Sequence, residues 1–128
     1  MLMLDTHALV WLASDQSKLT PDAKAVIREH AGDLCMSSIS GMEIALLHKR
    51  SRLELPLDPA TFVARALNVH GIVEIPVTAE MGCRAAALPD IHNDPFDRII
   101  VAACQAGGHV LLSKDGTIPR YPGMTVRW

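Results

Sequence analysis

Short apolar runs alternate along the chain with segments in which apolar residues recur at helical spacing. The runs are nearly continuous rather than alternating, as is typical of strands whose two faces are both buried. The predicted strands are Met1–Leu4, Leu34–Met36, Ile72–Ile75, Val110–Leu112 and Met124–Val126. Strands separated by helical segments predict right-handed crossovers and a mostly parallel sheet covered by helices on both faces.

Helix starts are marked by residues that cap helices. Thr20, Asp58 and Asp94 are each followed by proline, which fits the first turn of a helix. Thr78 and the spacing Ser40-x-x-Glu43, a possible capping box, mark two further starts. The predicted helices are His7–Ala13, a helix from Thr20, Ser40–Arg50, Asp58 to about Asn68, Thr78–Ala87, and Asp94 to the Gly107-Gly108 stop. With no internal repeat and no linker, residues 1–128 are expected to form one α/β domain.

Composition and charge narrow the class of protein. The chain is 49% hydrophobic and carries a formal net charge of −2, so any affinity for a polyanion must come from a local basic patch or from bound cations. Cys35, Cys83 and Cys104 form no C-x-x-C pair and are expected to be buried free thiols. No apolar run approaches the roughly 18 to 20 residues of a membrane span. A cytoplasmic protein is expected.

Acidic residues follow the predicted strands, where functional groups collect in open parallel sheets. Asp5 follows the first strand, Asp115 follows the fourth, and Glu43 lies early in the helix after the second. Asp97 lies in the first turn of the helix that leads to the fourth strand. Leu46 and Leu47 share the helical face of Glu43, so its carboxylate should point inward. Clustered carboxylates raise one another's pKa. A bound Mg²⁺ or Mn²⁺ ion is the usual way in which proteins stabilise such carboxylates in their ionised form.

Each of these acids also has a structural interpretation. Asp94 can be an N-cap, Asp97 can reach back to that cap, Asp5 can cap the next helix, and Asp115-Gly116 is an ordinary turn pair. Taken singly, each structural interpretation is the stronger one. Function is indicated instead by the convergence of at least three acids, Asp5, Glu43 and Asp115, at one edge of the sheet, because spacing alone does not fix the location of the turn that carries Asp97.

Four stretches together resemble the PIN-domain nucleases, most closely the VapC-like toxins of bacterial toxin–antitoxin pairs. They are L-D-T-H-A-L-V-W-L at the start, S-x-x-S-x-x-E-I from Ser37, H-N-D-P-F-D-R-I-I-V-A-A from His92, and L-L-S-K-D before Gly116. The resemblance covers the whole chain in order, and D-P-F-D-R is its most specific part. It implies a three-layer α/β/α sandwich that hydrolyses RNA phosphodiester bonds with Mg²⁺ or Mn²⁺.

Carried over to this chain, the resemblance assigns a site. The catalytic and metal-binding acids are Asp5, Glu43, Asp97 and Asp115. The supporting residues are Thr6, Ser113, Asp94 and Arg98, the last as a contact to phosphate or to an acid unless it is only an exposed or ion-paired helix side chain. His7 and His92 are expected to make structural hydrogen bonds. The resemblance also implies an RNA substrate, a small antitoxin partner and a homodimer.

Basic residues could hold the RNA backbone. Lys114 adjoins Asp115, and the run His48–Arg52 contains Lys49, Arg50 and Arg52. The run equally suits favourable charge near a helix C-terminus, which is slightly the better interpretation. Two other functions stay open: a receiver-like phosphoacceptor domain, although Asp5 lacks the adjacent acid such domains use, and a catalytically inactive PIN-like binding module.

Overall fold

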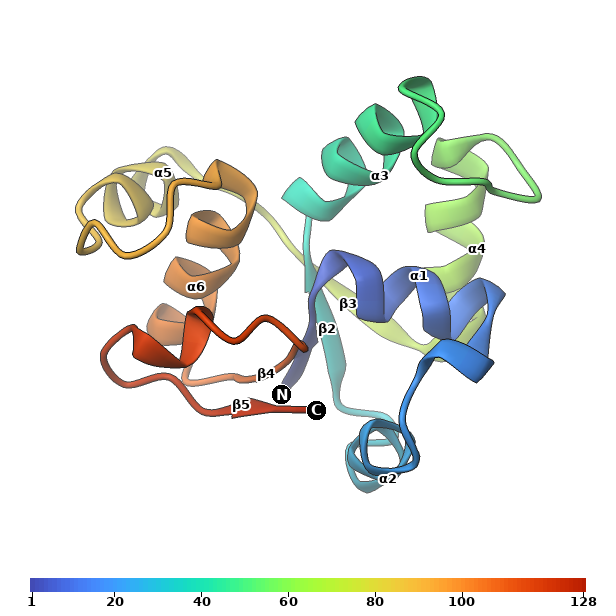
Figure 1. The fold of residues 1–128 in the computed structure, drawn as a ribbon, viewed down its shortest axis with the longest axis horizontal. Coiled ribbons are helices and arrows are strands. Elements are labelled where there is room, and N and C mark those ends of the chain that lie inside the picture. The colour runs from blue at the N-terminus through green and yellow to red at the C-terminus, as the bar shows by residue number, and fades with distance from the viewer.

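A five-stranded, all-parallel sheet forms the centre of the protein in the computed structural model, which describes residues 1–128 (Figure 1). The strands lie in the order β3–β2–β1–β4–β5. Their bounds are β1 Leu2–Leu4, β2 Leu34–Ser37, β3 Ile72–Ile75, β4 Val110–Leu112 and β5 Val126–Arg127. The predicted sheet of four to five strands is confirmed. The last strand begins two residues later than predicted, because Leu111 and Leu112 pair with Val126 and Arg127.

Helices cover both faces of this sheet, which gives the three layers. Figure 1 shows α5 and α6 on one side of the strands and α1, α2 and α4 on the other. The helices are α1 Thr6–Ser14, α2 Pro21–Glu29, α3 Ile39–Lys49, α4 Pro59–His70, α5 Ala79–Ala86 and α6 Pro95–Gly107. Two short 3₁₀ turns, Gln16–Lys18 and Ile118–Arg120, were not predicted. No helix has the length and apolar character needed to cross a membrane.

The core consists of two apolar clusters, one on each face of the sheet. Along β1, Leu2 and Leu4 face the cluster under α1, α2 and α4, whereas Met3 faces the cluster under α5 and α6. Side chains alternate between the faces of a strand, so a strand buried on both faces is apolar at every position. Of the three cysteines expected to be buried, Cys83 is exposed, because it lies on the solvent side of α5.

Most of the predicted helix starts are confirmed by their caps. The side chains of Thr20, Asp58 and Thr78 each accept a hydrogen bond from a backbone N–H three residues on, which satisfies a donor that the helix leaves free. The predicted capping box at Ser40 is wrong. Helix α3 begins one residue earlier, with Ser38 at the N-cap position, and Ser40 is fully buried inside the first turn.

The strand order places a topological switch point between β1 and β4. From β1 the chain moves through β2 to β3 on one side of the sheet, and then returns to add β4 and β5 on the other side. The segments that leave the carboxyl ends of β1 and β4 therefore diverge. In open parallel sheets the crevice between two such segments is where ligands bind.

Candidate metal centre

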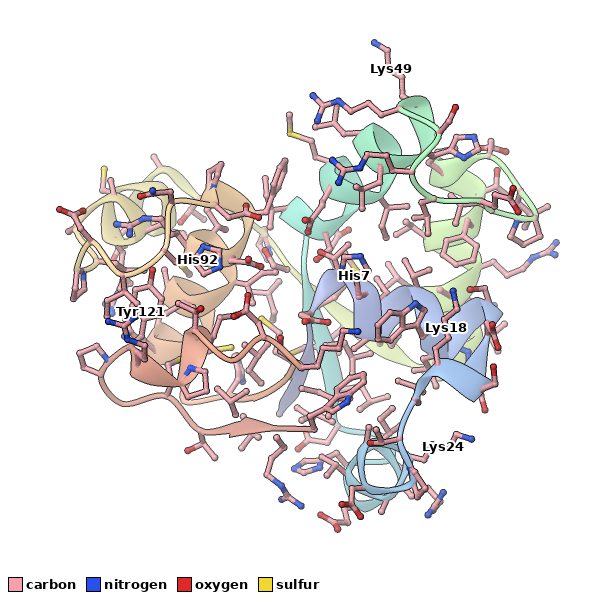
Figure 2. The ribbon with its side chains drawn as sticks, in the orientation of Figure 1. His7, Lys18, Lys24, Lys49, His92 and Tyr121 are labelled. Carbon is pink, nitrogen blue, oxygen red and sulfur yellow. The ribbon has the colours of Figure 1, made fainter.

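A pocket of about 290 Å³ lies at this switch point, and no hydrophobic residue lines it. Its eight lining residues come from four separate segments and are Asp5, Thr6, His7, Glu43, Asp94, Asp97, Lys114 and Asp115. Figure 2 shows His7 on the α1 side and His92 on the α6 side of this region. The predicted convergence of the four acids is observed, and a fifth carboxylate, that of Asp94, joins them. This arrangement is called the acidic pocket below.

Asp5 serves the fold and the pocket at the same time. It follows β1 directly and is the N-cap of α1, where its Oδ1 accepts a hydrogen bond of 2.8 Å from the N–H of Ala8. Burial raises the pKa of Asp5, and the nearby Ser113 hydroxyl and the Ala8 N–H offset only part of that rise. The structural interpretation of Asp5 is therefore confirmed, and its position in the pocket fits the functional interpretation, which stays a prediction.

Glu43 points into the pocket from the first turns of α3. The Thr6 hydroxyl donates to its Oε1 and also lies 3.0 Å from the hydroxyl of Ser40. Burial raises the pKa of Glu43, with the Thr6 contact opposing the rise. The Glu43 carboxylate points inward as predicted, although Leu46 and Leu47, on the same face of the helix, are themselves only partly buried. Thr6 thus has the supporting position that the sequence suggested, because it holds the carboxylate on α3 from the start of α1.

Asp97 and Asp115 meet through the ring of His92. The Nε2 atom of His92 lies 3.2 Å from an oxygen of each carboxylate. The backbone N–H of Asp94 donates to Nδ1 of the same ring at 3.1 Å, so the Nε2 proton faces the two acids. The hydrogen-bonding role expected for His92 is observed. One potential ligand atom from each of these three side chains lies within 4.8 Å of the others. Because Nε2 carries the proton, His92 positions the two carboxylates here and does not itself offer a ligand atom.

The two acids have opposite pKa shifts. Burial raises the pKa of Asp97 to about 7, and the charges of Asp94 and Glu43 add to the rise. For Asp115, burial also acts to raise the pKa, but hydrogen bonds from the Thr117 N–H and from His92 outweigh it and hold the pKa below its usual value. Asp115 therefore stays ionised at neutral pH, whereas Asp97 is near its midpoint when no cation is bound.

Asp94 is the N-cap of α6, as predicted. Its Oδ1 accepts a hydrogen bond of 2.9 Å from the N–H of Phe96. From the sequence, Asp94 is expected both as a possible N-cap and as a supporting residue of the site. The structure shows that Asp94 also lines the acidic pocket and raises the pKa of both Asp97 and Glu43. The capping residue therefore contributes negative charge to the site.

Arg98 does not contact a neighbouring acid, and it is neither an exposed nor an ion-paired side chain; its contact with phosphate stays a prediction. Its guanidinium is partly buried and donates to main-chain carbonyls around the end of α5 and the loop before α6. The four closest acceptors, at 2.9 to 3.0 Å, are the carbonyl oxygens of Ala85, Leu88, Pro89 and His92. Arg98 supports the site indirectly, because it holds the loop that carries His92 and Asp94. Sequence spacing carries no signal for such a contact.

The two residues before Asp115 also take distinct places. Ser113 is buried, and its Oγ accepts a hydrogen bond of 3.1 Å from the N–H of Asp115. It therefore shapes the turn that presents the last acid. Lys114 is exposed and lines the pocket, with its Nζ 4.9 Å from the ring centroid of Trp11. This contact with Trp11 was not predicted from the sequence.

The basic run lies apart from the acidic pocket. Lys49, Arg50 and Arg52 are exposed at the C-terminal end of α3, whereas Glu43 lies near the N-terminal end. None of the three lines the pocket. Figure 2 shows the side chain of Lys49 extending outward from the C-terminal end of α3. Their contact with an RNA backbone stays a prediction.

The residues of the acidic pocket suit a divalent cation. Carboxylate and hydroxyl oxygens are the hard ligands that Mg²⁺ and Mn²⁺ prefer. Burial raises the pKa of Asp5, Glu43 and Asp97, which means that the protein alone does not neutralise their charges. Lys114 and His7 are the basic residues that line the pocket. A cation would stabilise the ionised form of all five carboxylates at once.

The fold and the pocket together define an α/β/α domain with an acidic centre at the switch point of a parallel sheet. Comparison with known protein families identifies this domain. The PIN domain family matches residues 2–124, and the chain belongs to this family. The resemblance noted in the sequence is thereby confirmed.

Known proteins similar to this chain include a ribonuclease and a toxin–antitoxin complex. Ribonuclease VapC22 of Mycobacterium tuberculosis is 30% identical over 130 residues, which cover 99% of this chain and 98% of that protein. VapBC2 of Rickettsia felis, bound to a DNA fragment from its promoter, has a similar fold, with a TM-score of 0.72, 15% identity and coverage of 98% of this chain and 96% of that one. A toxin–antitoxin complex from Klebsiella pneumoniae gives a TM-score of 0.69 at 21% identity, covering 100% and 97%.

Proposed function

We propose that this protein is a divalent-metal-dependent endoribonuclease that acts in the cytoplasm as the toxin of a toxin–antitoxin pair. The observation that carries the proposal is the acidic pocket, in which carboxylates from four segments meet at the switch point of a PIN domain. The similarity to Ribonuclease VapC22 over nearly the whole chain supports RNA as the substrate. An inactive binding module has no need for three acids whose pKa is raised by burial.

In this proposal Asp5, Glu43, Asp97 and Asp115 hold Mg²⁺ or Mn²⁺. The bound ion would supply a coordinated water of lowered pKa and positive charge opposite the phosphate. Thr6 holds Glu43 in place, and Ser113 shapes the turn before Asp115. The Nε2 proton of His92 reaches Asp97 and Asp115 and keeps the two carboxylates adjacent. The chain's own task is therefore to keep several carboxylates ionised and fixed in position.

The proposed partner is a small antitoxin protein, and the proposed assembly of the toxin is a homodimer. The similarity of the fold to VapBC2 of Rickettsia felis and to the toxin–antitoxin complex of Klebsiella pneumoniae supports a partner of this kind. A receiver-like phosphoacceptor domain is disfavoured, because Asp5 is followed by Thr6 rather than by a second acid.

The test is cleavage of RNA by the purified protein, free of antitoxin, with Mg²⁺ or Mn²⁺. The wild-type protein should cleave, and both EDTA and the substitution Asp97→Asn should stop cleavage. Asp22→Asn is the matched control, because Asp22 is an exposed acid in the first turn of α2, away from the pocket. Cleavage that continues in EDTA or in the Asp97→Asn protein would contradict the proposal.

A further inference from the structure

A row of aromatic rings leads away from the acidic pocket along α1. The rings of His7 and Trp11 have centroids 5.6 Å apart, and those of Trp11 and Trp128 lie 5.7 Å apart. The ammonium of Lys114 lies over the Trp11 ring, 4.9 Å from its centroid. These four side chains are called the aromatic strip. They come from the two ends of the chain and the segment after β4, so no spacing in the sequence reveals them.

The aromatic strip is continuous with the site. His7 and Lys114 are exposed and line the acidic pocket, so the strip begins at the rim of the pocket. Trp11 and Trp128 are partly buried and pack against the core cluster on this face of the sheet. The outer part of the strip can therefore contact a ligand, while its inner part is fixed by the core.

The aromatic strip provides a way to bind RNA beside a pocket whose negative charge repels it. Five carboxylates repel a polyanion, and the chain as a whole is negatively charged. Stacking of bases on aromatic rings does not depend on charge, and single-stranded nucleic acids are commonly bound by aromatic side chains together with a few cations. His7, Trp11 and Trp128 provide rings, and Lys114 provides the cation.

From these contacts we infer that the aromatic strip binds unpaired bases of single-stranded RNA next to the acidic pocket, with Lys114 contacting the backbone phosphate. The inference rests on the proposed function and specifies the form of its substrate. Paired bases show the protein only their edges, so a duplex cannot use the strip. The substrate would then present an unpaired segment at the site of cleavage.

The natural fluorescence of the protein reports on this surface directly. The chain has two tryptophans, and both belong to the aromatic strip. The protein is titrated in EDTA, which prevents metal-dependent cleavage, with a short single-stranded oligouridylate. An abasic strand of equal length and charge and an RNA duplex are the comparisons. Quenching and binding are expected with oligouridylate and not with the other two ligands. Equal affinity for the abasic strand would overturn the inference.

Substitutions at exposed positions separate stacking from charge. His7→Ala should weaken binding of oligouridylate on the order of tenfold, and His7→Phe should restore it because the ring returns. Lys114→Met should lower the salt dependence of binding by about 0.7 in slope, the share of one phosphate contact on a single strand. Lys24→Met, on α2 and outside the pocket and the strip, is the control and should change neither value.

The outcomes distinguish this inference from the proposed function. If His7→Ala binds oligouridylate as the wild type does, the strip does not bind bases, even if the protein cleaves RNA. If a protein partner shields the tryptophans while oligouridylate does not, the strip is a protein interface and the inference is wrong. Binding is measured without cleavage, so a failed nuclease assay leaves the result intact.

Discussion

Helices α1 and α6 both begin at an aspartate that lines the acidic pocket, but the two starts are built differently. At α1 a single residue, Asp5, follows β1 directly, caps the helix and carries a partly buried carboxylate. At α6 the two tasks fall to separate residues, with Asp94 as the cap and Asp97 one turn further on. The start of α6 also follows a loop, which Arg98 and His92 hold in place.

The difference has a physical origin. A strand of the central sheet fixes the position of Asp5, because Asp5 is the next residue after β1 and its N–H donates to the carbonyl of Leu112 in β4. No strand precedes α6, so its start depends on side-chain contacts. We therefore expect one residue, Asp5, to govern both stability and catalysis at the α1 start, whereas different residues should govern them at the α6 start.

The largest expected effect is at Asp5. Both Asp5→Asn and Asp5→Ala should reduce RNA cleavage at least about a hundredfold, because each removes an acid that binds the cation. Asparagine can still cap α1, so only Asp5→Ala should lower the free energy of unfolding, by about 1 kcal/mol. Cleavage rates and urea unfolding measure the two effects. If Asp5→Asn cleaves normally, Asp5 is only a cap.

The next largest expected effect is the loss of stability when Arg98 is substituted. The α1 start has no counterpart of this arginine. Arg98→Ala should lower the free energy of unfolding by about 3 kcal/mol, because several main-chain carbonyls lose a charged donor. Arg98→Lys should recover part of this loss, since one ammonium cannot reach both sides of the loop. Amide exchange in residues 85–94 should rise. Arg84→Ala, an exposed arginine on α5, is the control, and an equal loss there would refute the role of Arg98.

Stability should depend on pH through Asp97. Its pKa is raised to about 7 in the folded protein, above the usual value near 3.9 in the unfolded chain. The folded protein therefore binds more protons between these values, and the contribution of Asp97 to the free energy of unfolding falls as pH rises through about 7. Asp97→Asn should remove this part of the pH dependence.

A divalent cation should restore the free energy of unfolding that is lost when Asp97 ionises. Mn²⁺ at about 100 times its dissociation constant should stabilise the protein by about 2.7 kcal/mol, and the rise in melting temperature should be larger at about pH 8 than at about pH 6, where protons compete for Asp97. Thermal unfolding with and without Mn²⁺ measures the effect. An equal rise at both pH values would mean that Asp97 does not bind the ion.

Residues whose roles follow from their neighbours in the chain could be predicted from the sequence. Caps such as Thr20 and Asp58, the parallel sheet, and acids directly after strands belong to this group. Roles set by tertiary packing could not be predicted. Arg98 finds its acceptors at the end of α5 and in the loop before α6, and Ser40 leaves its expected capping position to pack beside Thr6.

The same distinction explains how the site was predicted. Asp5 and Asp115 follow strands whose carboxyl ends must meet, so the sheet alone brings them together. Glu43 lies early in the helix that follows β2, so its place at this edge also follows from the sheet. Asp97 lies on a helix that no strand directly precedes, and only the resemblance to a family assigned it to the same pocket. The pairing of His92 with Asp97 and Asp115, and the aromatic strip, depend on how loops fold onto the sheet.

The smallest expected effect is at Asp94, and it is the sharpest test of the α6 start. Asp94→Ala should cost about 1 kcal/mol of stability through the lost cap, whereas Asp94→Asn should keep the cap and the cleavage activity. Asp94 also raises the pKa of Asp97 through its charge. Both substitutions should therefore lower the pKa of Asp97 and move the rising limb of the pH–rate profile to lower pH. If Asp94→Asn instead abolishes cleavage at every pH, Asp94 is itself a metal-binding acid, and α6 combines capping and chemistry just as α1 does.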